Sequence, residues 1–140
     1  MFMNKPAKEG TPLHWHQDRW SYLDRDPLIT IWTALDPATV ANGCVQIVAG
    51  MHHRLINPSN QSGFLEDHQI AELLQDAKII HLELAAGECV LLHNYLPHAS
   101  EINTTEIPRR AFSVCYMDAA TQTTSGESYS VLLGKGALQL

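Results

Sequence analysis

The sequence predicts a mainly all-β fold of the sandwich, barrel or jelly-roll type, with one short helix. Short runs rich in β-branched and aromatic residues recur along the chain, and turn residues separate them. Only one segment, residues 65–76, has the apolar i, i+3, i+4 spacing of a helix, through Ile70, Leu73 and Leu74. No repeat or linker divides the 140 residues, so we expect one domain with one hydrophobic core.

The expected strands are short and lie between clear turn signals. The clearest is 28–35, where apolar and polar residues alternate, and Asn42-Gly43 is a turn pair that precedes another. In chain order, the expected strands are 2–4, 13–18, 28–35, 44–48, 78–84, 89–93 and 111–117. We expect the folded core to cover residues 1–118 and the Thr-, Ser- and Gly-rich residues 119–140 to form a C-terminal tail.

Composition and charge exclude several classes of protein. The net charge is -6 and the nine basic residues are scattered, so no basic stripe indicates nucleic acid as a partner. No apolar run reaches the roughly 18 residues that a membrane-spanning helix needs. Three widely spaced cysteines, without a CxxC motif, predict buried free thiols in a reducing compartment, taken here as the cytoplasm.

The most informative motif is the segment His14-Trp15-His16-Gln17-Asp18. If it continues a strand, His14, His16 and Asp18 share one face, and Trp15 and Gln17 lie on the other. A His-x-Asp then directs an imidazole nitrogen and a carboxylate oxygen at one point. With a third ligand from a distant strand, such a set holds iron(II) on one face and leaves its other positions open.

Two later residues complete this hypothesis. His98 follows a run of expected strands and is the candidate third ligand. Arg109 stands at the start of the last strand, where a guanidinium can bind a carboxylate through two parallel hydrogen bonds.

The chain resembles the phytanoyl-CoA dioxygenase family of iron(II)/2-oxoglutarate oxygenases. The resemblance covers residue 1 to about residue 118, in the family's order and at about its spacing. The segments that carry it are MFMNKP at 1–6, HWHQD at 14–18, IWTALD at 31–36, NGCVQIVAGMHH at 42–53 and LLHNYLPHASEINTTEIPRRA at 91–111. Family members are usually longer, and the resemblance implies that their N-terminal region is absent here.

The resemblance implies a double-stranded β-helix, or cupin-like jelly roll, and a role for each matching residue. His16, Asp18 and His98 match the iron ligands. The residues that match the 2-oxoglutarate pocket are Arg109, Ser100, Trp32 and Met1. Gln17 is assigned either to substrate contact or to ordering of the ligands, and His93 to the strand rather than to the metal.

The implied reaction uses iron(II), 2-oxoglutarate and dioxygen. The cosubstrate is decarboxylated to succinate and carbon dioxide while a small or medium organic substrate is hydroxylated. Because Asp18 is present, hydroxylation is favoured over the halogenation of relatives that carry a small residue there.

Two alternatives stay open at this point. One is a cupin-type metal enzyme that uses His14, His16 and His98, although no glutamate follows the His-x-His soon enough for that motif. The other is a non-catalytic or truncated jelly-roll module that binds metal without turnover.

Overall fold

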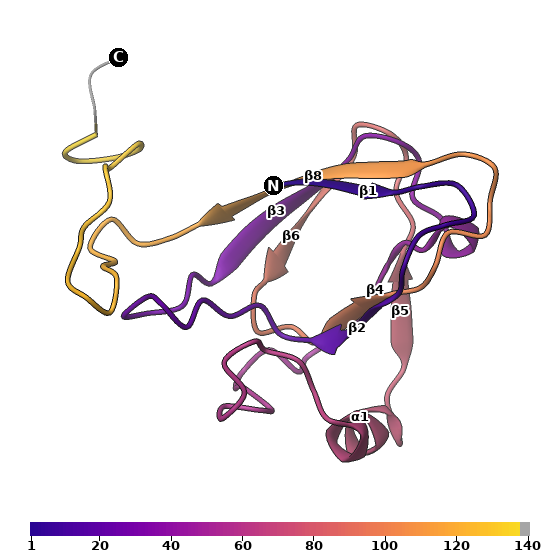
Figure 1. The fold of residues 1–140 in the computed structure, drawn as a ribbon, viewed down its shortest axis with the longest axis horizontal. Coiled ribbons are helices and arrows are strands. Elements are labelled where there is room, and N and C mark those ends of the chain that lie inside the picture. The colour runs from indigo at the N-terminus through magenta and orange to yellow at the C-terminus, as the bar shows by residue number, and fades with distance from the viewer. Residues whose placement is uncertain (138–140) are drawn as a thin grey trace.

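The computed structural model describes residues 1–137 and contains two four-stranded antiparallel sheets that face each other (Figure 1). The first sheet has the order β1 (Phe2–Lys5), β8 (Arg109–Tyr116), β3 (Ile29–Ala34) and β6 (Cys89–His93). The second has the order β2 (Leu13–His16), β7 (His98–Ser100), β4 (Val45–Val48) and β5 (Ile79–Leu82). From β2 onward the chain crosses repeatedly between the sheets, which confirms the predicted jelly roll.

Two hydrophobic clusters hold the layers together. The cluster between the sheets includes Trp32, Ala34, Val45 and Ala111, all of which are buried. A second cluster lies on the other side of the second sheet, where helix α1 (Asp67–Leu74) covers it. Its members are Trp15, Val48, Leu65, Leu73 and Ala99.

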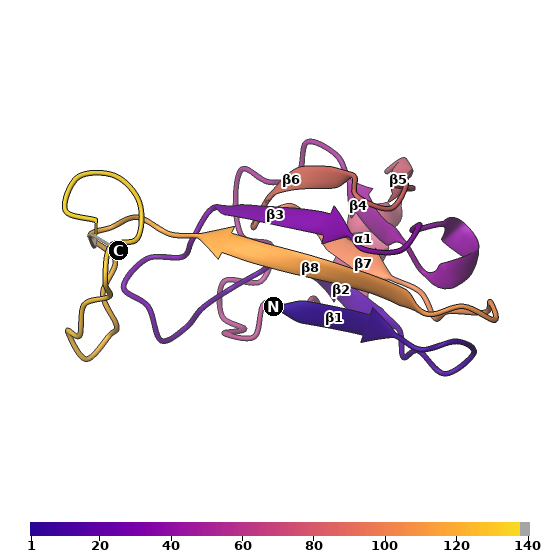
Figure 2. The same ribbon diagram turned by 90° about the horizontal axis from the view of Figure 1, so that it is seen from above.

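The outer face of the first sheet has no such cover among the described residues, and side chains such as Leu91 and Phe112 are exposed there. Figure 2 shows this sheet from above, with β3, β8 and β1 side by side.

The structure corrects the expected bounds of several elements. The helix covers Asp67–Leu74 instead of 65–76, because Glu66 and Gln69 form a capping box that fixes its start. Strand β7 was not expected, since three residues directly after Pro97 are too short to show alternation. The strand expected at 89–93 is confirmed. No described helix is long and apolar enough to cross a membrane.

The cysteines were predicted to be free and buried. They are free, but only Cys44 is buried, whereas Cys89 and Cys115 are exposed on the first sheet. Beyond β8, residues 119–137 contain no helix or strand and fold back through isolated bridges, one of which joins Thr123 to Leu23.

Candidate metal centre

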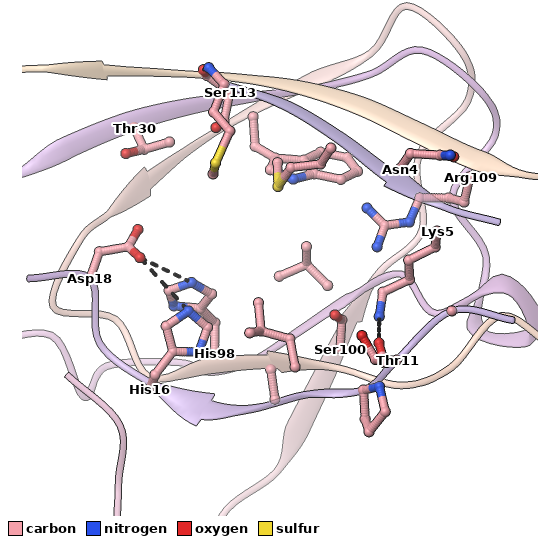
Figure 3. Close-up of a pocket in the computed structure, with 18 of the residues that line it drawn as sticks. Asn4, Lys5, Thr11, His16, Asp18, Thr30, His98, Ser100, Arg109 and Ser113 are labelled. Atoms are coloured by element: carbon pink, nitrogen blue, oxygen red, sulfur yellow. Dashed lines mark hydrogen bonds and ion pairs between the residues drawn. The ribbon is translucent and has the colours of Figure 1, made fainter. Parts of the chain in front are cut away.

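The three predicted ligands come together at one end of the space between the sheets (Figure 3). His16 ends β2, His98 begins β7, and the two are direct partners across the strands. Asp18 lies in the loop that follows β2. One potential ligand atom from each residue lies within 4.8 Å of the others. The Oδ1 atom of Asp18 is 3.7 Å from Nε2 of His16 and 3.9 Å from Nε2 of His98.

Backbone carbonyls fix the tautomer of both imidazoles. Nδ1 of His16 lies 2.8 Å from the carbonyl of His14, and Nδ1 of His98 lies 2.8 Å from the carbonyl of Leu96. Because a carbonyl oxygen only accepts, each Nδ1 carries a hydrogen, and in the neutral imidazole Nε2 then keeps its lone pair. Both lone pairs are therefore free on the side of Asp18, as metal-binding histidines require.

The electrostatics of the cluster favour a cation. Burial, and next the neighbouring His98, lower the pKa of His16 to about 4, so its imidazole is neutral near pH 7. Burial is also the main cause that raises the pKa of Asp18. A metal with bonds of roughly 2.1 Å holds ligands about 3 Å apart at right angles and about 4 Å apart when opposite. The donor set fits iron(II). The measured separations of 3.7 and 3.9 Å exceed the right-angle spacing that three ligands on one face need by less than about 1 Å.

The expected position of His14 is wrong. The register of β2 shifts between Leu13, which pairs with Ser100, and His16, which pairs with His98, so one extra residue lies on β2. Such a bulge breaks the two-residue alternation. Leu13 therefore lines the pocket with His16, while His14 is exposed and does not line it. The cupin-type set His14, His16 and His98 is not assembled.

The metal cluster opens into a pocket of about 390 Å³ between the two sheets. All four residues expected to bind the cosubstrate line it: Met1, Trp32, Ser100 and Arg109. Figure 3 shows Asp18 and the two histidines at one end and Arg109 at the other.

Arg109 is a buried cation without an acidic partner among the described residues. It is 4% exposed, and one Nη donates to the carbonyl of Gly43 at 3.1 Å. Its Nε has no hydrogen-bond partner, and its guanidinium lies 5.4 Å from the centre of the Trp32 ring. An unpaired buried donor on a cation is costly, and an anion in the pocket would remove that cost.

Lys5 is a second cation at this end that the sequence analysis missed. It pairs directly with Arg109 across β1 and β8, and its Nζ donates to the carbonyl of Thr11 at 2.6 Å. Burial, followed by the charge of Arg109, lowers the pKa of Lys5 to about 8, although Glu101 partly opposes this. In MFMNKP only the two-residue spacing of Met1, Met3 and Lys5 was visible. Met3 and Lys5 lie on β1, Met1 directly precedes it, and all three line the pocket.

The neighbouring residues Gln17, His93 and Arg110 have structural contacts. Gln17 is 1% exposed and both ends of its side-chain amide are hydrogen-bonded. His93 ends β6, as predicted, and its Nδ1 accepts from the amide of Tyr95. Arg110 points outward and forms a two-bond pair with Asp36 at 2.8 Å.

A jelly roll with two histidines and one carboxylate on one face defines the class of non-haem iron oxygenases. Within this class, the family model for phytanoyl-CoA dioxygenase (PhyH) matches residues 1–111, and the chain belongs to this family.

Relatives and solved structures agree with this family. A Caenorhabditis elegans phytanoyl-CoA dioxygenase domain-containing protein 1 homologue is 28% identical over 92% of this chain and 49% of its own length. Human peroxisomal phytanoyl-CoA dioxygenase is 28% identical over 86% of this chain and 38% of its own. The non-haem alpha-ketoglutarate-dependent carbocyclase SnoK has a TM-score of 0.70 and 26% identity over 87% of this chain and 50% of its own. The chain thus spans half or less of the length of these three proteins.

Proposed function

We propose that this chain is the core of an iron(II)/2-oxoglutarate-dependent oxygenase that hydroxylates a small or medium organic molecule. The observation that carries the proposal is a single pocket with two complementary ends. His16, Asp18 and His98 offer a ligand set for a cation at one end, and unpaired Arg109 offers a site for a carboxylate at the other. 2-Oxoglutarate has one carboxylate for each end and a keto group beside the first.

In this proposal the predicted metal ligands and cosubstrate contacts each have a defined task. The Nε2 atoms of His16 and His98 and the carboxylate of Asp18 would hold iron(II). When bound, it would supply the site at which dioxygen is activated as 2-oxoglutarate is decarboxylated to succinate and carbon dioxide.

Arg109 donates to the distal carboxylate of the cosubstrate, and its Nε gains the partner that it lacks. Lys5 adds a second positive charge and the hydroxyl of Ser100 a further hydrogen bond. Trp32, which is buried, forms an apolar wall that excludes water along the carbon chain, and Met1 lines the pocket but is itself 74% exposed.

The class of substrate and the cellular compartment of the protein remain predictions. The pocket volume of about 390 Å³ suits a small molecule. The cytoplasm was predicted from the cysteines, whereas the name of the human relative places that protein in the peroxisome.

The test is succinate formation by the purified chain. We expect release to require iron(II), dioxygen and 2-oxoglutarate together, and to rise when a library member is a substrate. Anaerobic addition of iron(II) and 2-oxoglutarate should give the visible charge-transfer absorption of a chelated 2-oxo acid. If both ligands bind but no succinate forms with any substrate, the chain is a non-catalytic binding module and the proposal fails.

A further inference from the structure

The turn between β6 and β7 contacts two of the three metal-binding residues through its backbone. Residues 94–97 present four successive carbonyl oxygens, and each accepts one hydrogen bond. The donors, in order from Asn94 to Pro97, are the amide of Asp18 at 2.8 Å, Nε2 of Gln17 at 2.6 Å, Nδ1 of His98 at 2.8 Å and the amide of Val48 at 3.2 Å. The turn therefore fixes the imidazole of His98 and the backbone that carries Asp18 at the same time.

Asp18 depends on such anchoring because it lies outside β2. The strand ends at His16, so no ladder of the sheet holds the next residues. The loop is tied on both sides of Asp18. On one side, the side-chain amide of Gln17 donates to the carbonyl of Tyr95. On the other side, the backbone amide of Trp20 donates to the carboxylate of Asp26 at 2.9 Å. Asp26 also accepts from the hydroxyl of Tyr95, at 3.0 Å, so both ties lead back to the same turn.

The side chain of Gln17 makes more hydrogen bonds than the other ties of this loop. Its Nε2 uses both hydrogens, one on the carbonyl of Tyr95 and one on the carbonyl of Arg54 at 2.9 Å. Its Oε1 accepts from the amide of Ile56 at 2.7 Å. A side chain that is 1% exposed and makes three bonds requires an amide, because a carboxylate lacks the donors and an apolar group lacks both.

We propose that Gln17 is a positioning residue of the metal centre, which locks the loop of Asp18 to the turn that orients His98. The inference rests on the proposed metal site, and it assigns to Gln17 an ordering role and no contact with substrate. Metal ligands must be held to within about 0.5 Å, so loosening one tie lowers affinity without removing a ligand.

The test compares Gln17→Met with Asn42→Leu, two near-isosteric removals of a buried amide. Asn42 is 3% exposed and bonds the carbonyl of Pro37 and the amide of Thr39, away from the metal cluster. Co²⁺ alone is titrated into each folded protein, and its visible absorption reports the ligand geometry. We expect the Kd of Gln17→Met to rise by roughly 10- to 100-fold with a changed spectrum. Asn42→Leu should stay within about twofold of the wild type.

A milder variant keeps the test decisive if Gln17→Met does not fold. Tyr95→Phe removes only the hydroxyl bond to Asp26 and should weaken Co²⁺ binding by about threefold. Wild-type affinity and spectrum in Gln17→Met, or in Tyr95→Phe where the first variant is unfolded, would overturn the inference.

The readout separates this inference from the proposed function. A wild-type chain that binds Co²⁺, shows the Gln17 effect and makes no succinate with iron(II) would refute the oxygenase alone. A chain that makes succinate while Gln17→Met binds Co²⁺ normally would refute the positioning role alone. A wild-type chain that binds no Co²⁺ would refute both.

Discussion

The two ends of the pocket are built in different ways. At the metal end, His16 and His98 face each other across β2 and β7, and backbone carbonyls orient both rings. At the other end, Lys5 and Arg109 face each other across β1 and β8 as two like charges, an arrangement that destabilises a sheet.

Each end therefore lacks a partner of opposite charge: the metal end lacks a cation, and the other end lacks an anion. The metal end holds a half-buried carboxylate whose pKa is raised by desolvation, and the other end holds a buried Nε without a partner. The fold thus prepares one pocket for a cation and an anion together, which is the charge pattern of a metal with a dicarboxylate cosubstrate.

The largest effect is expected at the metal end. Asp18→Ala removes the only carboxylate of the cluster and should weaken Co²⁺ or iron(II) binding by at least about 100-fold. His14→Ala is the matched control, because this adjacent histidine is exposed and outside the pocket. Calorimetric titration measures both. Equal losses in the two variants would mean that the cluster is assembled differently in solution.

The next largest effect is expected at the opposite end of the pocket, and it should change 2-oxoglutarate binding but not metal binding. Arg109→Ala should raise the Kd for 2-oxoglutarate by roughly 10- to 100-fold, because a charge-assisted two-bond contact is lost. Co²⁺ affinity should not change. Arg110→Ala is the control, since that arginine points outward to Asp36. If Arg110→Ala weakens 2-oxoglutarate binding as much as Arg109→Ala does, the anion does not lie in the pocket.

Lys5 should contribute less, and its contribution should depend on pH. Lys5→Met is expected to raise the Kd for 2-oxoglutarate about tenfold near pH 7. The pKa of Lys5 is lowered to about 8, so the charged form is lost as the pH rises through that value. Wild-type affinity should therefore fall above about pH 8, while the affinity of Lys5→Met stays level. The two binding curves should converge at high pH, and parallel curves would exclude Lys5 as the titrating group.

The smallest effect is expected outside the pocket, where the charges are already compensated. Hydrogen bonds from Arg110 lower the pKa of Asp36 to about 2. This pair stabilises the folded state above the ordinary carboxyl pKa of about 3.9, and the contribution is lost as the pH falls toward 2. Asp36→Asn should be slightly less stable than the wild type at pH 7 and equal to it near pH 2. Denaturant unfolding at both values measures this, and 2-oxoglutarate binding should be unaffected.

Much of the fold and the site was predictable from residue patterns. Strand β6 was located to the residue, because Gly87 and the apolar run after it mark its start clearly. The direction of Trp15, away from His16, followed from alternation and was confirmed by its place in the second hydrophobic cluster. The grouping of His16, Asp18 and His98 was predicted, and the structure brings these residues together.

The two errors about the pocket have one physical origin, which is the pairing of strands. His14 was placed on the metal side because alternation assumes an unbroken strand, and the bulge between Leu13 and His16 reverses it. Lys5 was missed because its role depends on lying beside Arg109, more than a hundred residues later in the chain.

Residue types and their local spacing were enough to predict which side chains bind the metal and that a β-rich fold would present them. Ligand types, alternation and turn residues are local properties, so a single chain displays them. Three features became visible only in the folded chain. The amide of Asp18 is hydrogen-bonded to the turn before β7, Nε of Arg109 lacks a partner, and Lys5 lies at the same end of the pocket as Arg109. These features arise from register and hydrogen bonds between distant segments, which no local pattern encodes.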